Sequence, residues 1–192
     1  MKMIDLDDLI SDLDSIKNSI SQIRVNKKYK NQWFVSGEME YRTSEKRLKE
    51  IEQMIKEGEN YDNQEEKVKT RKISYDNKNQ LQLDLADKIS EITGDSFMPR
   101  GLFFYPVNGF MEWHTNGASP GKRIYFTHTN EANKSFFRYR DKEGIIHTSY
   151  DSGVGWQMRE FEITARHGKD IPYWHCIGSM TDRFSMGFGA CG

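Results

Sequence analysis

Two histidines, an asparagine and an arginine in the second half of the chain are the residues whose types and spacing best suit chemistry. His114 and Asn116 are two positions apart, and residues at i and i+2 of a β-strand face the same side, so both can be aimed at one point. His175 is the best candidate for a third ligand. Two imidazoles and one oxygen on one face leave three positions open on an octahedral ion. This pattern predicts a non-haem iron site where a co-substrate and dioxygen bind together.

Arg183 and Ser185 also stand two positions apart, in a predicted final strand. A guanidinium and a hydroxyl on one face would clamp the far carboxylate of a dicarboxylic acid, and a 2-oxo acid group at its near end would chelate the metal. Two plainer interpretations stay open. Asn116 with Gly117 is also a turn signal, and Arg183 would equally suit a salt bridge to a carboxylate on a neighbouring strand.

The other histidines, one cysteine and two arginines are weaker candidates for a functional site. Three further histidines lack a partner at ligand spacing, and we expect them to be structural or exposed: His128, His147 and His167. Cys176 follows His175 directly, so on a strand it would point to the opposite face, away from the metal. Arg138 and Arg140 alternate with aromatic residues and would line either a substrate groove or an exposed strand face.

Composition limits the class of protein. The chain has 192 residues, a net charge of −1 and two cysteines. This length fits one domain with a small extension, and the charge gives no indication of a nucleic-acid partner. The two cysteines predict free thiols in a reducing compartment. The charged N-terminus lacks the apolar segment of a signal peptide, and no stretch is long enough to span a bilayer, so we expect a cytoplasmic protein.

The chain divides into two parts of different texture, residues 1–96 and 97–192. The first part is highly charged and carries apolar residues at helical spacing, which predicts helices near its start, over 44–57 and over 77–93. The polar stretch 59–76 predicts an exposed loop. The seam of the first helix favours an amphipathic helix lying on the domain over a coiled coil, and it consists of Leu6, Leu9, Leu13, Ile16, Ile20 and Ile23.

The second part holds all four prolines and most of the glycine and aromatic residues. Its short alternating segments, separated by turn signals, predict eight strands. They cover 101–106, 109–114, 122–129, 135–140, 145–150, 155–163, 173–178 and 182–189. The expected class is therefore α+β, with a jelly roll or barrel preceded by a helical N-terminal region.

Five motifs, taken in order, resemble the Fe(II)/2-oxoglutarate-dependent dioxygenase superfamily and are most similar to its prolyl-4-hydroxylase-like branch. They are the segments 109–116, 122–126, 135–137, 174–176 and 181–185. The similarity covers roughly residues 97–190. It implies a double-stranded β-helix, and oxidative decarboxylation of 2-oxoglutarate coupled to hydroxylation of a second substrate. That substrate is left open as a protein side chain, a nucleobase or a small metabolite.

The resemblance also implies roles for individual residues. Carried over by position, His114 and His175 would bind Fe(II), with Asn116 in the place of the family's carboxylate. The residues that would bind 2-oxoglutarate are Arg183 and Ser185, assisted by Tyr105 or Tyr125.

Two features depart from the family pattern. Asn116 brings no negative charge, so the site should hold iron less tightly. The interval from His175 to Arg183 is slightly shorter than usual, which a β-bulge would absorb. The alternative function is therefore a catalytically inactive jelly-roll protein that serves binding or structure. A cupin-like metal protein without 2-oxoglutarate would leave Arg183 and Ser185 without a role.

Overall fold

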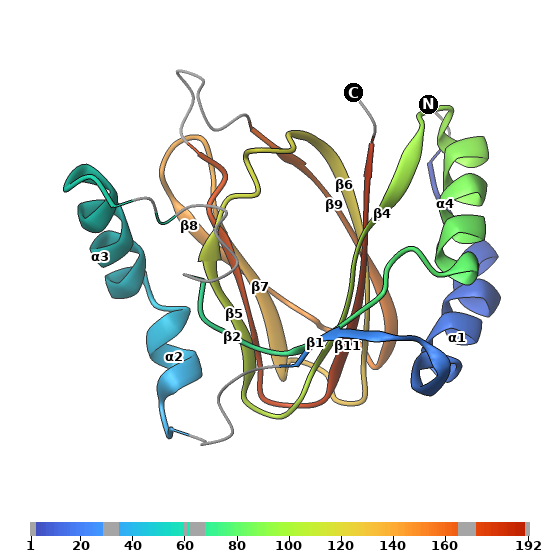
Figure 1. Ribbon diagram of the computed structural model, residues 1–192, viewed down its shortest axis with the longest axis horizontal. Helices are drawn as coiled ribbons and strands as arrows, with labels where there is room; N and C mark the ends of the chain where they lie inside the picture. The colour runs from blue at the N-terminus through green and yellow to red at the C-terminus, as the bar shows by residue number, and fades with distance from the viewer. Residues whose placement is uncertain (1–2, 29–34, 60, 62–67, 165–171, 191–192) are drawn as a thin grey trace.

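The computed structural model describes residues 3–28, 35–59, 61, 68–164 and 172–190. These residues form an α+β arrangement in which two antiparallel sheets face each other and helices cover the outer side of each sheet (Figure 1). None of the helices in this part of the chain is long and apolar enough to cross a membrane. His167 and Cys191 lie outside the described residues.

Eight strands from the second half of the chain are divided equally between the two sheets. The large sheet holds, in spatial order, β4 (Phe97–Tyr105), β11 (Arg183–Ala190), β6 (Gly121–Thr129) and β9 (Gly155–Ile163). The small sheet holds β5 (Gly109–His114), β10 (His175–Ser179), β7 (Ser135–Arg140) and β8 (Ile146–Tyr150). All eight predicted strands are present, and their arrangement is compatible with a jelly roll.

Short strands from the first half extend both sheets. The large sheet gains β3 (Ile73–Tyr75) beside β4 and then β1 (Val25–Lys27), and the small sheet gains β2 (Thr70–Arg71) beside β5. The prediction of an exposed loop over 59–76 was therefore wrong in part. Tyr61 and Val68 are also buried. The edges of β4 and β5 offer unpaired backbone groups, and these recruit segments that are too short and polar to show strand periodicity.

Helices α1 (Ile10–Asn18) and α4 (Gln80–Thr93) cover the outer face of the large sheet (Figure 1). Short 3₁₀ turns, Asp7–Leu9 and Ile20–Gln22, flank α1. The seam predicted for the first helix packs onto the sheet, with its central members Leu9, Leu13 and Ile16 fully buried. This confirms the amphipathic helix. α4 begins where the Asn79 side chain accepts a hydrogen bond from the backbone and ends at Gly94, whose φ of 78° suits glycine.

Helices α2 (Glu38–Arg42) and α3 (Glu45–Lys56) lie against the outer face of the small sheet (Figure 1). α3 matches a predicted helix, whereas α2 is too short to show a periodic pattern. Two arginines of β7 hold these helices on the small sheet. Arg138 donates to the carbonyl of Thr43, at the end of α2, at 2.7 Å, and Arg140 pairs with Glu52 of α3 at 2.7 Å. Both arginines therefore anchor helices and do not line a substrate groove.

Candidate metal and anion site

The structure brings the two candidate histidines together. His114 ends β5 and His175 begins β10, and they are direct partners in the antiparallel register. Their ring centroids are 4.1 Å apart, with 56° between the ring planes. Both side chains are buried, and the fold brings them together although sixty residues separate them in the sequence.

A β-bulge in β5 turns His114 towards the space between the sheets. His175 pairs with His114 and Ile177 pairs with Met111, so β5 has one residue more than β10 between these pairs. Because of this extra residue, Glu112 and Trp113 both contact the outer helices, while Met111 and His114 line the interior. Strict alternation would have placed His114 and Glu112 on one face.

Both imidazoles have the same hydrogen-bond arrangement. His114 Nδ1 donates to the Glu112 carbonyl at 2.8 Å, and His175 Nδ1 donates to the Tyr173 carbonyl at 3.1 Å. A carbonyl only accepts, so each Nδ1 carries the proton and each Nε2 keeps its lone pair. Burial lowers the pKa of both rings, that of His114 well below its usual value and that of His175 to about 4. Neutral imidazoles with a free Nε2 are the form that binds a metal.

Asn116 lies in the turn that its sequence position allowed, and its side chain also reaches His175. Its φ of 54° and the hydrogen bond that its carbonyl accepts from Ser119 at 3.0 Å place it in a turn. Its side-chain Nδ2 also lies 3.2 Å from His175 Nε2. Within the described part of the chain, no group of three or more His, Cys, Asp or Glu side chains is arranged to hold a metal. The side chain that lies beside His175 is a neutral amide and not a carboxylate.

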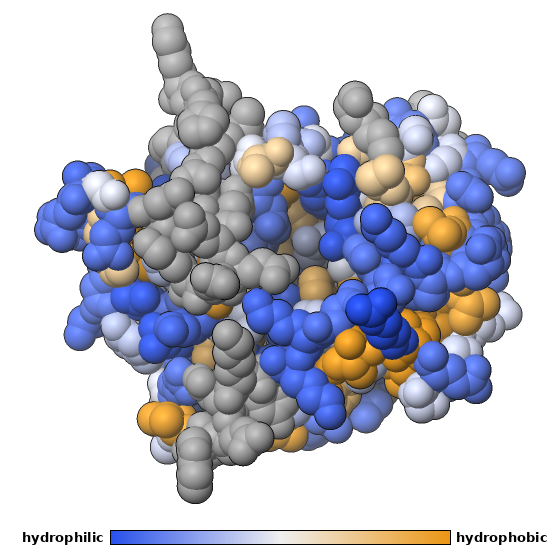
Figure 2. Space-filling model, viewed as in Figure 1, coloured by the Kyte–Doolittle hydropathy of each residue, from blue (hydrophilic) through white to orange (hydrophobic). Residues whose placement is uncertain are grey.

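A cavity of about 360 Å³ opens between the sheets beside these residues. His114 and Asn116 line it together with three residues predicted to bind a dicarboxylate: Tyr105, Tyr125 and Ser185. Figure 2 shows a hollow near the centre of the face seen there, bordered by hydrophilic side chains. The volume falls at the small end of the range for ligand pockets, which suits compact molecules.

Arg183 lies deeper and has a partner that the sequence did not reveal. Its Nε pairs with Asp151 Oδ2 at 2.9 Å, and its Nη2 donates to Thr127 Oγ1 at 3.1 Å. Arg183 thus forms a salt bridge, as the alternative interpretation predicted, but its partner follows β8 of the other sheet and does not lie on a neighbouring strand. Yet Arg183 Nη1 and the Tyr105 hydroxyl are both buried without a hydrogen-bond partner among the described residues. The Arg183 guanidinium carbon lies 5.4 Å from the centre of the Tyr105 ring.

These two unsatisfied groups need an explanation, because buried polar atoms in folded proteins are nearly always hydrogen-bonded. Arg183 and Tyr105 are register partners on β11 and β4, so their side chains leave the same part of the large sheet. Ser185, two residues along β11, lines the cavity. An acceptor with two or more oxygens would satisfy both groups at once.

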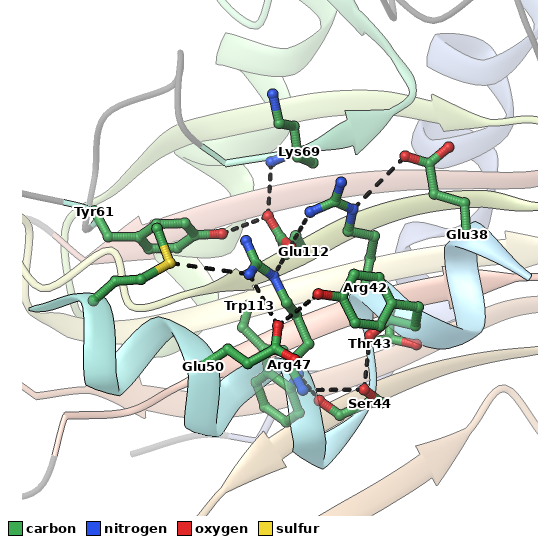
Figure 3. Close-up of polar contacts among 12 residues, drawn as sticks. Glu38, Arg42, Thr43, Ser44, Arg47, Glu50, Tyr61, Lys69, Glu112 and Trp113 are labelled. Atoms are coloured by element: carbon green, nitrogen blue, oxygen red, sulfur yellow. Dashed lines mark hydrogen bonds and ion pairs between the residues drawn. The ribbon is translucent and has the colours of Figure 1, made fainter. Parts of the chain in front are cut away.

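A second polar cluster, on the outer face of β5, was missed by sequence reasoning. Glu112 is fully buried and accepts hydrogen bonds from Arg47 Nε at 2.6 Å, Arg42 Nη1 at 3.1 Å, the Tyr61 hydroxyl and the Lys69 backbone nitrogen at 3.1 Å (Figure 3). The only sequence signal is a glutamate inside an apolar strand. The cluster fixes the residue whose carbonyl holds the His114 ring.

The remaining candidates take structural positions, as predicted. His147 is exposed and pairs with Asp141 at 2.6 Å, and His128 packs edge-on against Trp156. Cys176 is buried in the apolar cluster beneath α3, on the face opposite His175, and burial raises the pKa of its thiol.

Comparison with known proteins leaves the family open. No family model matches the chain, and no curated protein matches it. Among solved structures, the chain resembles a Pseudomonas putida prolyl-4-hydroxylase with a TM-score of 0.43 and 13% identity over 94% of this chain and 99% of that one. It also resembles Drosophila melanogaster CENP-C bound to CAL1, with a TM-score of 0.33 and 9% identity over 77% and 100%. Neither likeness is strong enough to carry an assignment, so the function rests on the residues.

Proposed function

We propose that this chain binds a divalent metal and 2-oxoglutarate between its two sheets and acts as an Fe(II)/2-oxoglutarate-dependent oxygenase. The observation that carries the proposal is the pair of neighbouring buried histidines, each with its proton on Nδ1 and a lone pair on Nε2, of which His114 lines the cavity. In this proposal, residues 97–192 form a double-stranded β-helix domain and residues 1–96 form a helical extension that packs on it.

The side chains fit the groups that this reaction requires. His114 and His175 would hold the metal through Nε2, with the Asn116 amide beside them. The unsatisfied Arg183 Nη1 and Tyr105 hydroxyl would receive the distal carboxylate of 2-oxoglutarate. Tyr125 and Ser185 line the path between the two ends. Bound iron would supply the activation of dioxygen with 2-oxoglutarate that leads to hydroxylation of a second substrate.

One observation favours a second candidate, a jelly-roll protein that binds a ligand without catalysis. The Asn116 amide nitrogen points at His175 Nε2, and a donor in that place competes with a metal for the lone pair. If this hydrogen bond persists in solution, the cavity would keep its ligand site and lose its metal site.

The experiment is a calorimetric titration of the full chain with Mn(II), followed by N-oxalylglycine, an unreactive analogue of 2-oxoglutarate. We expect one metal ion per chain, with His114→Ala abolishing its binding. N-oxalylglycine should bind only when metal is present and should raise the melting temperature by mass action. Metal binding that survives in His114→Ala would contradict the proposed ligands.

Tyr105→Phe tests the carboxylate end without disturbing the core. The change removes a buried hydroxyl that has no partner in the described residues, so stability should stay equal or rise slightly. The affinity for N-oxalylglycine should nevertheless fall about tenfold, because a hydrogen bond to a charged group is lost. Tyr75→Phe, which alters a tyrosine packed on the outer core, is the matched control and should leave that affinity unchanged. An equal affinity in both variants would remove Tyr105 from the site.

A further inference from the structure

Two cationic side chains, Arg100 and Arg123, line the cavity and have no role in the proposed binding of the metal or 2-oxoglutarate. Arg123, on β6, is only 3% exposed. Its guanidinium donates only to backbone carbonyls, those of Gly121 at 3.3 Å, Lys122 at 3.1 Å and Ser119. No carboxylate among the described residues pairs with it. A buried guanidinium without an anionic partner is costly and calls for one.

Arg100 is held next to Arg123 by a bulge in β4. Gly187 of β11 pairs with Gly101 while Phe188 pairs with Pro99, so Arg100 is the extra residue. Between the two arginines lies Gly189, where a Cβ would stand 2.8 Å from Arg123 Nη1 and 2.9 Å from Arg100 Nε. The absence of a side chain at this glycine lets both guanidinium groups lie across β11.

The local charge is strongly one-sided. Burial and the nearby charge of Arg100 lower the pKa of Arg123. Arg100 is exposed and forms no ion pair within the described part of the chain. None of the cavity's described lining residues carries a carboxylate. The cavity therefore attracts more negative charge than one dicarboxylate held near Arg183 would supply.

We propose that Arg100 and Arg123 form an anion site that takes the phosphate group of the second substrate, a small phosphate monoester. This inference rests on the proposed function, because it assigns the substrate class of the same cavity. Two adjacent guanidinium groups match a dianionic phosphate in charge and in donor geometry. The cavity volume of about 360 Å³ suits a small molecule better than a polymer. His114 lines the same cavity, so a molecule held by its phosphate would lie beside the metal ligands.

The test is calorimetric titration of the full chain with inorganic phosphate, adenosine monophosphate and O-phosphoserine, each against adenosine or serine as the unphosphorylated partner. The phosphorylated probes should bind. Tighter binding of adenosine monophosphate would indicate a nucleotide substrate, and tighter binding of O-phosphoserine would indicate another phosphorylated metabolite. Arg100→Gln and Arg123→Gln should each weaken binding about tenfold or more. Lys142→Gln removes one positive charge from an exposed turn outside the cavity lining and should change nothing.

The outcomes separate this proposal from the function on which it rests. Arg123 is buried, so the exposed Arg100 carries the test if Arg123→Gln fails to fold. Phosphate binding that is unaffected by Arg100→Gln, or equal binding of the unphosphorylated partners, would overturn the anion site. The Mn(II) and N-oxalylglycine titrations in the same Arg100→Gln variant should match the parent. If the parent binds phosphate but neither Mn(II) nor N-oxalylglycine, the oxygenase is refuted and the anion site remains as a binding function.

Discussion

Asn116 presents a neutral amide where a carboxylate would complete a metal triad, and its surroundings decide what that difference does. Its backbone lies in the left-handed region at φ 54°, a conformation that asparagine and aspartate both adopt more readily than other side chains. The turn would therefore accept aspartate without added strain. The amide nitrogen, 3.2 Å from His175 Nε2, is the part of the residue that opposes a metal.

Asn116→Asp should tighten metal binding. The new carboxylate adds a negative charge and removes the donor that competes for the His175 lone pair, so we expect Mn(II) affinity to rise about tenfold or more. Succinate formation from 2-oxoglutarate at saturating iron should rise as well. Both quantities are measured in the parent and in the variant.

Two other outcomes would be informative about Asn116. If the parent forms succinate and Asn116→Asp abolishes it, the amide is adapted to this site's own chemistry. If neither protein forms succinate while both bind metal and N-oxalylglycine, the oxygenase would be rejected in favour of a binding protein.

The site depends on strand β5, because the bulge lets one short segment contact the helices on its outer side and the cavity on its inner side. On the outer side, Glu112 and Trp113 attach α2 and α3 to the small sheet (Figure 3). On the inner side, the Glu112 carbonyl accepts a hydrogen bond from His114 Nδ1. A change in the outer cluster should therefore reach His114, the proposed metal ligand, through the backbone.

Glu112→Gln should destabilise the fold and weaken metal binding together. The variant leaves the charges of Arg42 and Arg47 without their shared buried anion, at a cost of about 3 kcal/mol in the free energy of unfolding. Urea denaturation measures this cost, and a Mn(II) titration measures the affinity. Glu45→Gln, which alters an exposed glutamate on α3, is the matched control and should change neither. If a destabilised Glu112→Gln protein kept full metal affinity, the outer cluster would not influence His114 on the inner face of β5.

Helix α1 should contribute stability alone. Leu13 is fully buried against the outer face of the large sheet, and Leu13→Ala should lower the free energy of unfolding by about 3 kcal/mol through the cavity that it creates. The sheet separates α1 from the histidines, so the Mn(II) affinity measured well below the melting temperature should equal that of the parent. A loss of affinity in the folded variant would show that the large sheet transmits the change.

The elements were predictable to different degrees for a physical reason. Alternation and turn chemistry act over a few residues, so segments such as 135–140 and 155–163 were located at their observed bounds. The β5 bulge has no local signature, because it is defined by the register with β10. For the same reason His114, His175 and Arg183 could be chosen from residue type and spacing, whereas Asp151, which pairs with Arg183 from a distant strand end, could not.

At the scale of the whole molecule, Asp151 ties the ends of strands from both sheets together. Its carboxylate pairs with Arg183 at 2.9 Å and with Arg159 at 2.5 Å, and it accepts a hydrogen bond from Ser135. Burial alone would raise the pKa of Asp151, but the two arginines and this hydrogen bond outweigh it and hold the pKa at about 2. The ionised form is therefore the one that the fold stabilises.

Stability should consequently fall in acid. The pKa of Asp151 is lower in the folded chain than in the unfolded one, so its contribution is complete above about pH 4 and is lost as the pH falls towards 2. The shift corresponds to about 2 kcal/mol. Urea denaturation between pH 2 and pH 5 should show a steeper decline in the parent than in Asp151→Asn, since other carboxylates titrate equally in both. Identical slopes would mean that Asp151 is not the titrating group.

The edge strands donated by the first half of the chain have a consequence for any shortened form of the protein. A fragment that starts at residue 97 would keep the eight strands from β4 to β11 and lose β1, β2 and β3. The backbone of β4 and of β5 would then lie bare at one edge of each sheet, and bare edges pair with other chains. Such a fragment should self-associate or precipitate during expression, so a search for activity in the isolated second half would report on aggregation before it reported on chemistry.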